Sequence, residues 1–194
     1  MAKLRIVPIN RADAGAAILS ASSAALPVDN LQNITKTSVW RATTTSATLT
    51  AAFTGLTTLD SIGLMTSNLS AAATWRARVF DGATMMADTG IILACPPDPL
   101  GDFDFGFAGL GVNGFAFGRF AHSVLWLPTR YVATSVQIDI SDPSNPAGYI
   151  EAARLFIGER WSPDNNFSWG NQLTPVENAK SSRAEDGTSR SEPG

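Results

Sequence analysis

Apolar and polar residues alternate with a period of two along much of this chain, the pattern of strands that bury one face and expose the other. The clearest case is Thr74–Phe80, where Trp75 and two further apolar residues alternate with Arg76 and Arg78. We expect Trp75 to face a hydrophobic core and both arginines to face outward. An Asp-Gly pair follows directly and is typical of a hairpin turn.

A second alternating stretch, Val132–Ser141, is followed by a turn-rich sequence and a further extended segment, Tyr149–Ile157. The pattern predicts two strands joined by a turn, because proline and glycine supply the backbone angles that turns require. The acidic residues Asp139, Asp142 and Glu151 are interpreted as part of an exposed face and a turn. The residues expected on the buried face of the first strand are Val132, Thr134, Val136, Ile138 and Ile140.

Further strands are predicted upstream, and Gly55 is expected to close one of them. The Ala- and Ser-rich segment Ala12–Ala25 fits either a helical turn or an irregular ribbon. Seven or eight strands without an amphipathic helix of useful length predict an all-β fold, an antiparallel β-sandwich or jelly roll. The remaining strand-like segments are Leu4–Ile9, Ala47–Phe53, Leu59–Ser67, Met85–Cys95 and His122–Leu127.

The segment 96–120 combines phenylalanine with many glycines, which weaken a continuous strand, so we interpret it as an insertion in the sandwich. It either folds over a small core of its own or forms an exposed apolar arm that packs against other subunits. The arm is favoured, because large apolar patches on a soluble chain usually mark interfaces. Its candidate interface residues are Phe103, Phe105, Phe107, Phe115 and Phe117.

Large apolar residues become rare after Trp161 and are nearly missing from Leu173–Gly194. Such a sequence buries too little apolar surface to offset the entropy of ordering, so alone it is expected to be disordered. The predicted organisation is a β-sandwich domain over residues 1–162, with the insertion at 96–120, and an extended polar C-terminal arm over residues 163–194.

Composition narrows the possible functions. The 194-residue chain is 44% hydrophobic and 16% charged, with a net charge of −3 and no basic run, so nucleic-acid binding is not expected. Cys95 is the only cysteine and His122 the only histidine, which excludes an internal disulfide and a cysteine–histidine zinc site. No run reaches the ~20 apolar residues of a membrane span, and the N-terminus does not resemble a signal peptide. We therefore expect a soluble chain made in a cytoplasm.

Few residues carry a pattern of ligand binding or catalysis. Trp40 and Trp75 could stack on sugars, but the core interpretation is favoured because large aromatics are usually buried. His122 lacks the neighbours of a catalytic triad, so a structural role is expected. Asp102 and Asp104 could form a paired-carboxylate or calcium site, although a solvated loop is favoured. We expect no catalytic residue, no bound metal and no cofactor.

The order of several motifs resembles a known family. The stretches ALPVDNLQNITKTSVWRA, LDSIGLMTSNLSAAATWRARVF and RYVATSVQIDISDPSNPAGYIEAARLFIG follow one another as in the discoidin, or coagulation-factor C-type, galactose-binding-like jelly roll. The family often has an Asp-Gly pair in a loop that helps to hold calcium; this chain has Asn33-Ile34 there, so no calcium site is carried over. The closing segment is similar to versions found in virion and tail proteins of tailed bacteriophages, with matches at Tyr131-Val132, Asp142, Asn145-Pro146, Gly148-Tyr149-Ile150 and Gly158.

The resemblance, which covers residues 20–162, implies a structural virion component of a tailed bacteriophage, at the tail tip, baseplate or tail surface. Such a protein acts by assembly with other tail proteins and with copies of itself, and it is located in the virion. The alternative is a lectin-like carbohydrate-binding module for a host-surface glycan, with candidate contacts Asn68, Asp102 and Asp104. A hydrolase is not expected, because no convergent carboxylate pair or triad is visible.

Overall fold

The computed structural model describes residues 4–35, 37–96, 121–163, 180–183 and 189–192. The chain divides into two units. One is Arg5–Ser162, and the other contains the antiparallel pair β9 (Lys180–Arg183) and β10 (Ser189–Glu192). The predicted extended arm did not include this hairpin, because neither segment shows apolar alternation.

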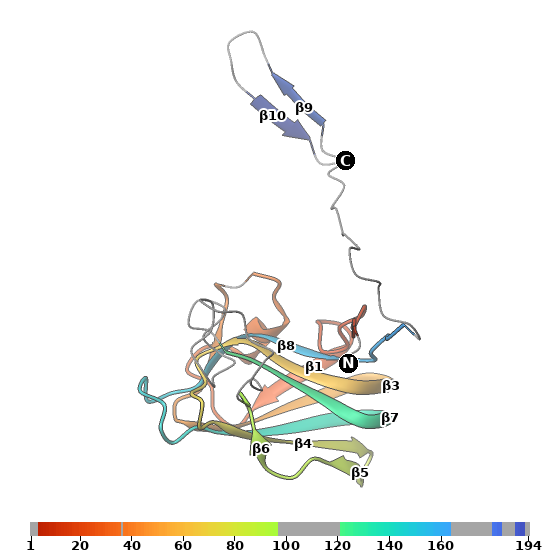
Figure 1. Cartoon of the computed structure of the whole chain (residues 1–194), viewed down its shortest axis with the longest axis vertical. Helices are drawn as coiled ribbons and strands as arrows, with labels where there is room; N and C mark the ends of the chain where they lie inside the picture. Colours follow the sequence, from red (N-terminus) through yellow and green to blue (C-terminus); the bar gives the residue numbers. More distant parts are fainter. Residues whose placement is uncertain (1–3, 36, 97–120, 164–179, 184–188, 193–194) are drawn as a thin grey trace. The chain divides into compact units, whose positions relative to one another are not determined.

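Arg5–Ser162 is an antiparallel β-sandwich, which confirms the predicted fold class (Figure 1). Helical structure among its described residues is limited to a short 3-10 helix, and none of them forms a helix with the length and hydropathy of a membrane span. The elements are β1 (Ala17–Ala21), η1 (Val28–Gln32), β2 (Trp40–Arg41), β3 (Ser46–Ser67), β4 (Thr74–Asp81), β5 (Thr84–Asp88), β6 (Ile92–Leu93), β7 (Ala121–Ser141) and β8 (Glu151–Gly158).

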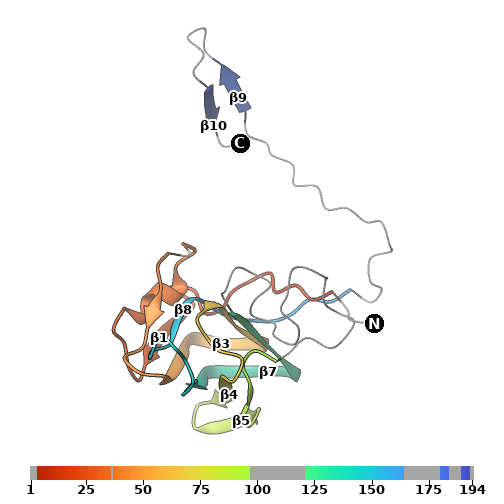
Figure 2. The ribbon, with the colours of Figure 1, turned by 60° about the vertical axis from the view of Figure 1, so that its left-hand side comes forward.

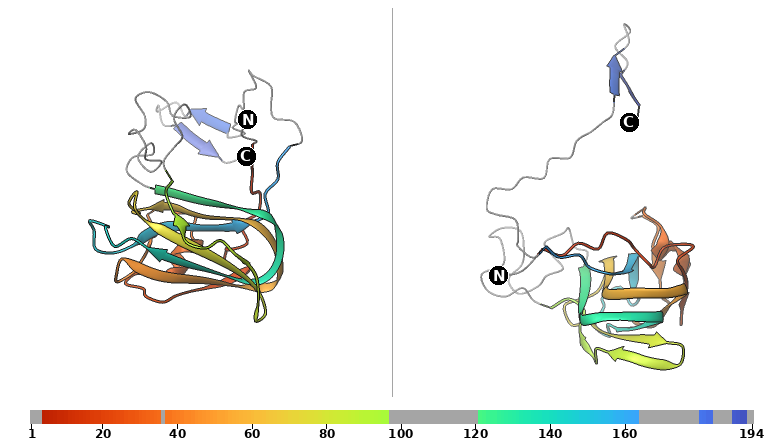
Figure 3. Two further views of the ribbon diagram at one scale, coloured as in Figure 1. Left: turned by 60° about the horizontal axis from the view of Figure 1, so that its bottom comes forward. Right: turned by 90° about the vertical axis from the view of Figure 1, so that its right-hand side faces the viewer.

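The long strands β3 and β7 pair with each other and bend together, so both layers of the sandwich share them (Figure 3). The first half of β3 pairs with β1 and its second half with β8, while the second half of β7 pairs with β4. One layer is therefore β1–β3–β7–β4, with β5 and β6 at its edge, and the other is β7–β3–β8–β2. Figure 2 shows β4 and β5 beside β7.

The bend explains why two predicted strand ends, at Gly55 and after Leu127, are wrong. Gly55 lies inside β3, between Ala52 and Thr57, where the pairing with β7 is interrupted. Pro128 lies at a second interruption of the same pairing, in the β7 stretch between Trp126 and Tyr131 that faces the β3 residues between Leu59 and Ser61. A glycine and a residue without a backbone N–H suit these two interruptions, because neither residue is paired between β3 and β7 and strands that change layers bend there.

The bend also changes the phase of the alternation in β7. Ala133 and Val136 are both fully buried although they are three positions apart, while Val132 is 50% exposed. The prediction that Val132 and Thr134 face the core is therefore wrong, whereas it is confirmed for the residues after the phase change, Val136, Ile138 and Ile140.

Both candidate sugar-stacking tryptophans are core residues, as the favoured interpretation predicted. Trp40 and Trp75 are 0% and 2% exposed, and the Trp40 indole N–H donates to the carbonyl of Ser23 at 3.2 Å. Cys95 is also buried, and burial raises the pKa of its thiol, whose sulfur lies 3.5 Å from the Ser123 hydroxyl.

The predicted apolar strand Met85–Cys95 is divided into β5 and β6. Gly90 has a φ of 65° and forms a turn between them. Ile91 is 75% exposed, and the two residues of β6 are also exposed at the edge of the layer. The run therefore contributes to the core through its end, Ala94 and Cys95, and not through the isoleucines and leucine at its centre.

Candidate functional site

Three neighbouring strands, β3, β7 and β4, place polar side chains in rows on the outer face of one layer. The middle row is Thr48, Asp139 and Arg76, which are cross-strand neighbours. The flanking rows are Ser46–Ser141–Thr74 and Thr50–Gln137–Arg78. Both arginines face outward as predicted, because the alternating residues of β4 are buried.

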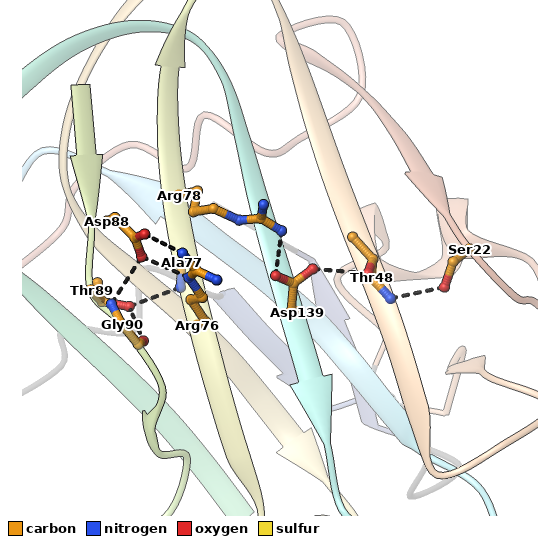
Figure 4. Close-up of polar contacts among 9 residues, drawn as sticks. All are labelled: Ser22, Thr48, Arg76, Ala77, Arg78, Asp88, Thr89, Gly90 and Asp139. Carbon is orange, nitrogen blue, oxygen red and sulfur yellow. Dashed lines mark hydrogen bonds and ion pairs between the residues drawn. The ribbon is translucent and has the colours of Figure 1, made fainter. Parts of the chain in front are cut away.

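Asp139 is the centre of a hydrogen-bond network on this face (Figure 4). Its Oδ1 accepts from the Thr48 hydroxyl at 2.9 Å, and its Oδ2 forms an ion pair with the Arg78 guanidinium. The backbone N–H of Thr48 donates to the Ser22 hydroxyl at 2.9 Å. The Asp139 side chain remains 35% exposed. Because each carboxylate oxygen has a second lone pair, Asp139 can still accept a hydrogen bond from a ligand hydroxyl.

Arg76 is fixed by a bidentate pair with Asp88. Its Nε donates to Asp88 Oδ1 at 2.8 Å, and its Nη2 donates to Oδ2. The hydrogen bond from Arg76, followed in size by that from the Gly90 N–H at 2.9 Å, holds the pKa of Asp88 well below its usual range. The Thr89 hydroxyl accepts from Ala77 N–H at 2.9 Å and so ties this turn to β4. The Arg76 guanidinium is therefore held in one place on the face.

A shallow depression of about 210 Å³ lies over the middle row and the row Ser46–Ser141–Thr74, and its lining includes Thr48, Arg76 and Asp139. Ile91 adds an exposed apolar side chain to the same lining. The depression therefore combines hydroxyl, carboxylate and guanidinium groups with one apolar contact, the mixture that binding sites for small polar molecules use.

The Nε of Arg78 is buried and has no hydrogen-bond partner among the residues described. A buried unpaired donor costs about 1–3 kcal/mol, and most folds avoid one.

Asn68, predicted as a glycan contact, ties two loops together. Its Nδ2 donates to the carbonyl of Tyr149 at 2.9 Å, and its Oδ1 accepts from the Glu151 N–H at 2.8 Å. Both ends of the amide are thus used within the fold, and its contact with a glycan stays a prediction.

Asp142, interpreted from the sequence as part of an exposed face and a turn, does begin a turn but is fully buried, so the expected exposure is wrong. Its carboxylate accepts from Ser70 N–H at 2.8 Å, the Ser70 hydroxyl at 2.6 Å and Asn145 Nδ2 at 3.1 Å. Asp142 is buried because it begins the turn after β7, where its carboxylate accepts hydrogen bonds from Ser70 in the loop that follows β3.

The other predicted site residues lie outside the described part of the chain, so their roles stay predictions. They are Asp102, Asp104, Phe103, Phe105, Phe107, Phe115 and Phe117. His122 Nδ1 accepts from the Thr66 N–H at 3.1 Å, which fits the expected structural role. Within the described ranges, no group of three or more His, Cys, Asp or Glu residues is arranged to hold a metal ion.

No protein-family model matches the sequence, and no curated protein matches it. A fucose-binding module of Streptococcus pneumoniae matches the structure with a TM-score of 0.50 and 10% identity, over 77% of this chain and 94% of the module. A GH29 fucosidase of Ruminococcus gnavus, solved with fucose, matches with a TM-score of 0.51 and 10% identity, over 80% of this chain. The match covers 27% of the fucosidase, so this chain resembles about a quarter of that enzyme.

The module CpGH89CBM32-5 of Clostridium perfringens, solved with GalNAc-β-1,3-galactose, matches with a TM-score of 0.49 and 11% identity, over 73% of this chain and 94% of the module. At 10% identity the matches to the fucose-binding module and the fucosidase show the fold alone, a β-sandwich as predicted. The narrower resemblance, to bacteriophage tail proteins, has no counterpart among the structures named here.

Proposed function

We propose that this chain is a non-catalytic carbohydrate-binding module and that it binds a neutral saccharide on the outer face of β3, β7 and β4. The observation that carries the proposal is the row Thr48–Asp139–Arg76, whose polar groups are held by hydrogen bonds at a depression beside exposed Ile91. The likeness in fold to a fucose-binding module supports the same class of ligand.

The chemistry of the row suits a sugar. A pyranose carries hydroxyl groups at its rim and C–H groups on its faces. Asp139 can accept from two neighbouring hydroxyls, and Arg76 can donate to another, in charge-assisted hydrogen bonds that are about twice as strong as neutral ones. Ile91 provides an apolar contact for the ring. Because Thr48, Arg78 and Asp88 already hold these groups, binding immobilises few additional rotamers.

The face carries little net charge, because Arg78 is paired with Asp139 and Arg76 with Asp88. A neutral ligand therefore fits better than an acidic or basic one. The assembly role in a bacteriophage virion, with its location there, stays a prediction from the motif resemblance, since no contact described above bears on it.

The test is an NMR titration of the full chain with neutral saccharides, including fucose and galactose, compared between wild type and Asp139→Asn. We expect shifts confined to β3, β4, β7 and the turn at Ile91, and a loss of affinity of about tenfold or more in Asp139→Asn, because hydrogen bonds to charged groups contribute about 1.5–3 kcal/mol. Glu151→Gln is the matched control, since Glu151 also pairs with an arginine, Arg41 at 2.7 Å, and does not line the depression.

Two results would contradict the proposal. One is the lack of any saccharide-induced shift on this face. The other is equal affinity in Asp139→Asn and wild type.

A further inference from the structure

A separate groove of about 150 Å³ lies where the chain enters and leaves the sandwich. Its walls come from three places: the N-terminal segment, the bend of β7 and the residues after β8. The residues that line it are Pro8, Ile9 and Arg11, then Arg130, then Glu159, Arg160 and Trp161.

Backbone hydrogen bonds fix the walls of the groove. Ile6 and Trp161 exchange two of them, at 2.9 and 2.7 Å. The Arg11 N–H donates to the carbonyl of Ile157 at 2.6 Å, and the Ile157 N–H donates to Asn10 Oδ1 at 3.0 Å. Gly158 allows this close approach, because a Cβ there would lie 2.5 Å from the carbonyl oxygen of Ile9. The groove is therefore pre-formed, which lowers the entropic cost of binding.

Trp161 supplies an aromatic surface to this groove. It is 51% exposed, in contrast to the buried Trp40 and Trp75. An indole ring offers a broad apolar face, on which the C–H face of a sugar ring can lie. Because the backbone on both sides of Trp161 is held, the ring is positioned from a rigid support.

The charges around Trp161 are unequal. Arg130 pairs with Glu159 at 2.7 Å and lies 3.7 Å from the buried carboxylate of Asp60, which also accepts an ion pair from Arg160 at 3.2 Å. Arg11 takes part in no ion pair among the residues that the structure describes. Three guanidinium groups thus face two carboxylates, and one positive charge is in excess.

We propose that this groove binds a saccharide that carries a carboxylate, with the sugar ring against Trp161 and the carboxylate hydrogen-bonded by Arg11 and Arg130. Arginine is suited to this role because its planar fork of N–H groups matches a carboxylate. Trp161 calls for a sugar ring in the ligand and Arg11 calls for a negative charge. A bare anion lacks the ring and a neutral sugar lacks the charge, so neither should bind as well as an acidic sugar. The proposal uses no residue of the face formed by β3, β7 and β4.

The test is isothermal titration calorimetry of the full chain carrying Asp139→Asn, which weakens the proposed neutral-saccharide site, with glucuronate, N-acetylneuraminate, glucose and acetate. We expect at least one of the two acidic sugars to bind at least about tenfold more tightly than glucose and acetate, which corresponds to about 1.4 kcal/mol. Whether glucuronate or N-acetylneuraminate binds more tightly shows whether the ligand is a uronic acid or a sialic acid.

Variants assign the binding to this groove. Arg11→Gln should lower the affinity for the acidic sugar about tenfold and leave that for glucose unchanged, whereas Trp161→Ala should abolish binding of the acidic sugar. Arg5→Gln is the matched control, because Arg5 stacks on Trp126 and does not line the groove. Thermal unfolding of each variant checks that it folds.

Three results would overturn the proposal: acetate binding as tightly as the acidic sugars, glucose binding as tightly as they do, or no binding of either acidic sugar. Asp139→Asn should leave the acidic sugar's affinity unchanged. A failure here is therefore distinguishable from a failure of the neutral-saccharide site, which Asp139→Asn alone tests.

Discussion

Replacing Asp142 tests whether a buried carboxylate holds the loops at one end of the sandwich. Asp142 is 0% exposed and accepts hydrogen bonds from Ser70 N–H, the Ser70 hydroxyl and Asn145 Nδ2. In Asp142→Ala the hydroxyl can rotate to another acceptor, but the other two donors are fixed. Each buried unsatisfied donor costs about 1–3 kcal/mol, so the free energy of unfolding should fall by about 4 kcal/mol.

Asp142→Asn is the matched variant, because its amide oxygen can accept from both fixed donors while its NH₂ group donates to the Ser70 hydroxyl. Only the charge assistance is lost, so a cost of about 1 kcal/mol is expected. Urea unfolding at pH 7, followed by circular dichroism, measures both. With an m-value of about 2 kcal/mol/M, the two midpoints should differ by about 1.5 M. A difference in unfolding free energy below about 1 kcal/mol would refute the reasoning that these donors depend on Asp142.

Three further predictions concern other parts of the sandwich. Gly158→Ala should destabilise the fold by about 1–3 kcal/mol in urea unfolding because of the 2.5 Å contact of its Cβ, whereas Gly55→Ala, whose Cβ meets nothing within 4 Å, should be near neutral. The hydrogen bond from Arg76 lowers the pKa of Asp88, so their pair contributes stability above the ordinary value of about 3.9 and loses it as the pH falls through the lowered value. In a carboxyl NMR titration, the Asp88 transition should lie below pH ~3.9 in wild type and move upward in Arg76→Gln; an unchanged transition would refute this cause. Burial raises the pKa of the Cys95 thiol, so this thiol should react with a disulfide reagent at pH 8 at least about 100-fold more slowly in native than in urea-unfolded protein.

Alternation in the sequence was sufficient to predict the fold class and the directions of many side chains. In Thr74–Phe80 it correctly placed Trp75 inside and Arg76 and Arg78 outside, because a regular strand has a strict period of two. It failed at the bend of β3 and β7, since the unpaired stretch changes the phase and exposes Val132. A bend shared by two strands distant in sequence leaves only weak local signals, a glycine and a proline.

The candidate site on the outer face depended on register, which the sequence did not reveal. Thr48, Arg76 and Asp139 come from three strands spread over most of the sandwich, and only their pairing places them in one row. Asp142 was misassigned for a related reason, because its partner Ser70 is 72 residues away. A single acidic residue in a turn sequence is more often exposed than buried, and only a tertiary contact reverses this expectation.

The two proposed sites differ in how their charges are arranged, and this difference leads to a last prediction. On the outer face, Arg76 and Arg78 each have a carboxylate partner, whereas in the groove Arg11 has none among the described residues. Mobile ions screen an unpaired surface charge strongly, since the Debye length falls from ~30 Å at 0.01 M to ~3 Å at 1 M. Binding of an acidic sugar should therefore weaken about three- to tenfold between ~0.02 and 0.5 M NaCl, while binding of a neutral saccharide should change less than about twofold. Titration calorimetry of the wild-type chain at both salt concentrations measures the two affinities. An equal salt dependence for the two ligands would mean that the unpaired arginine does not select the acidic one.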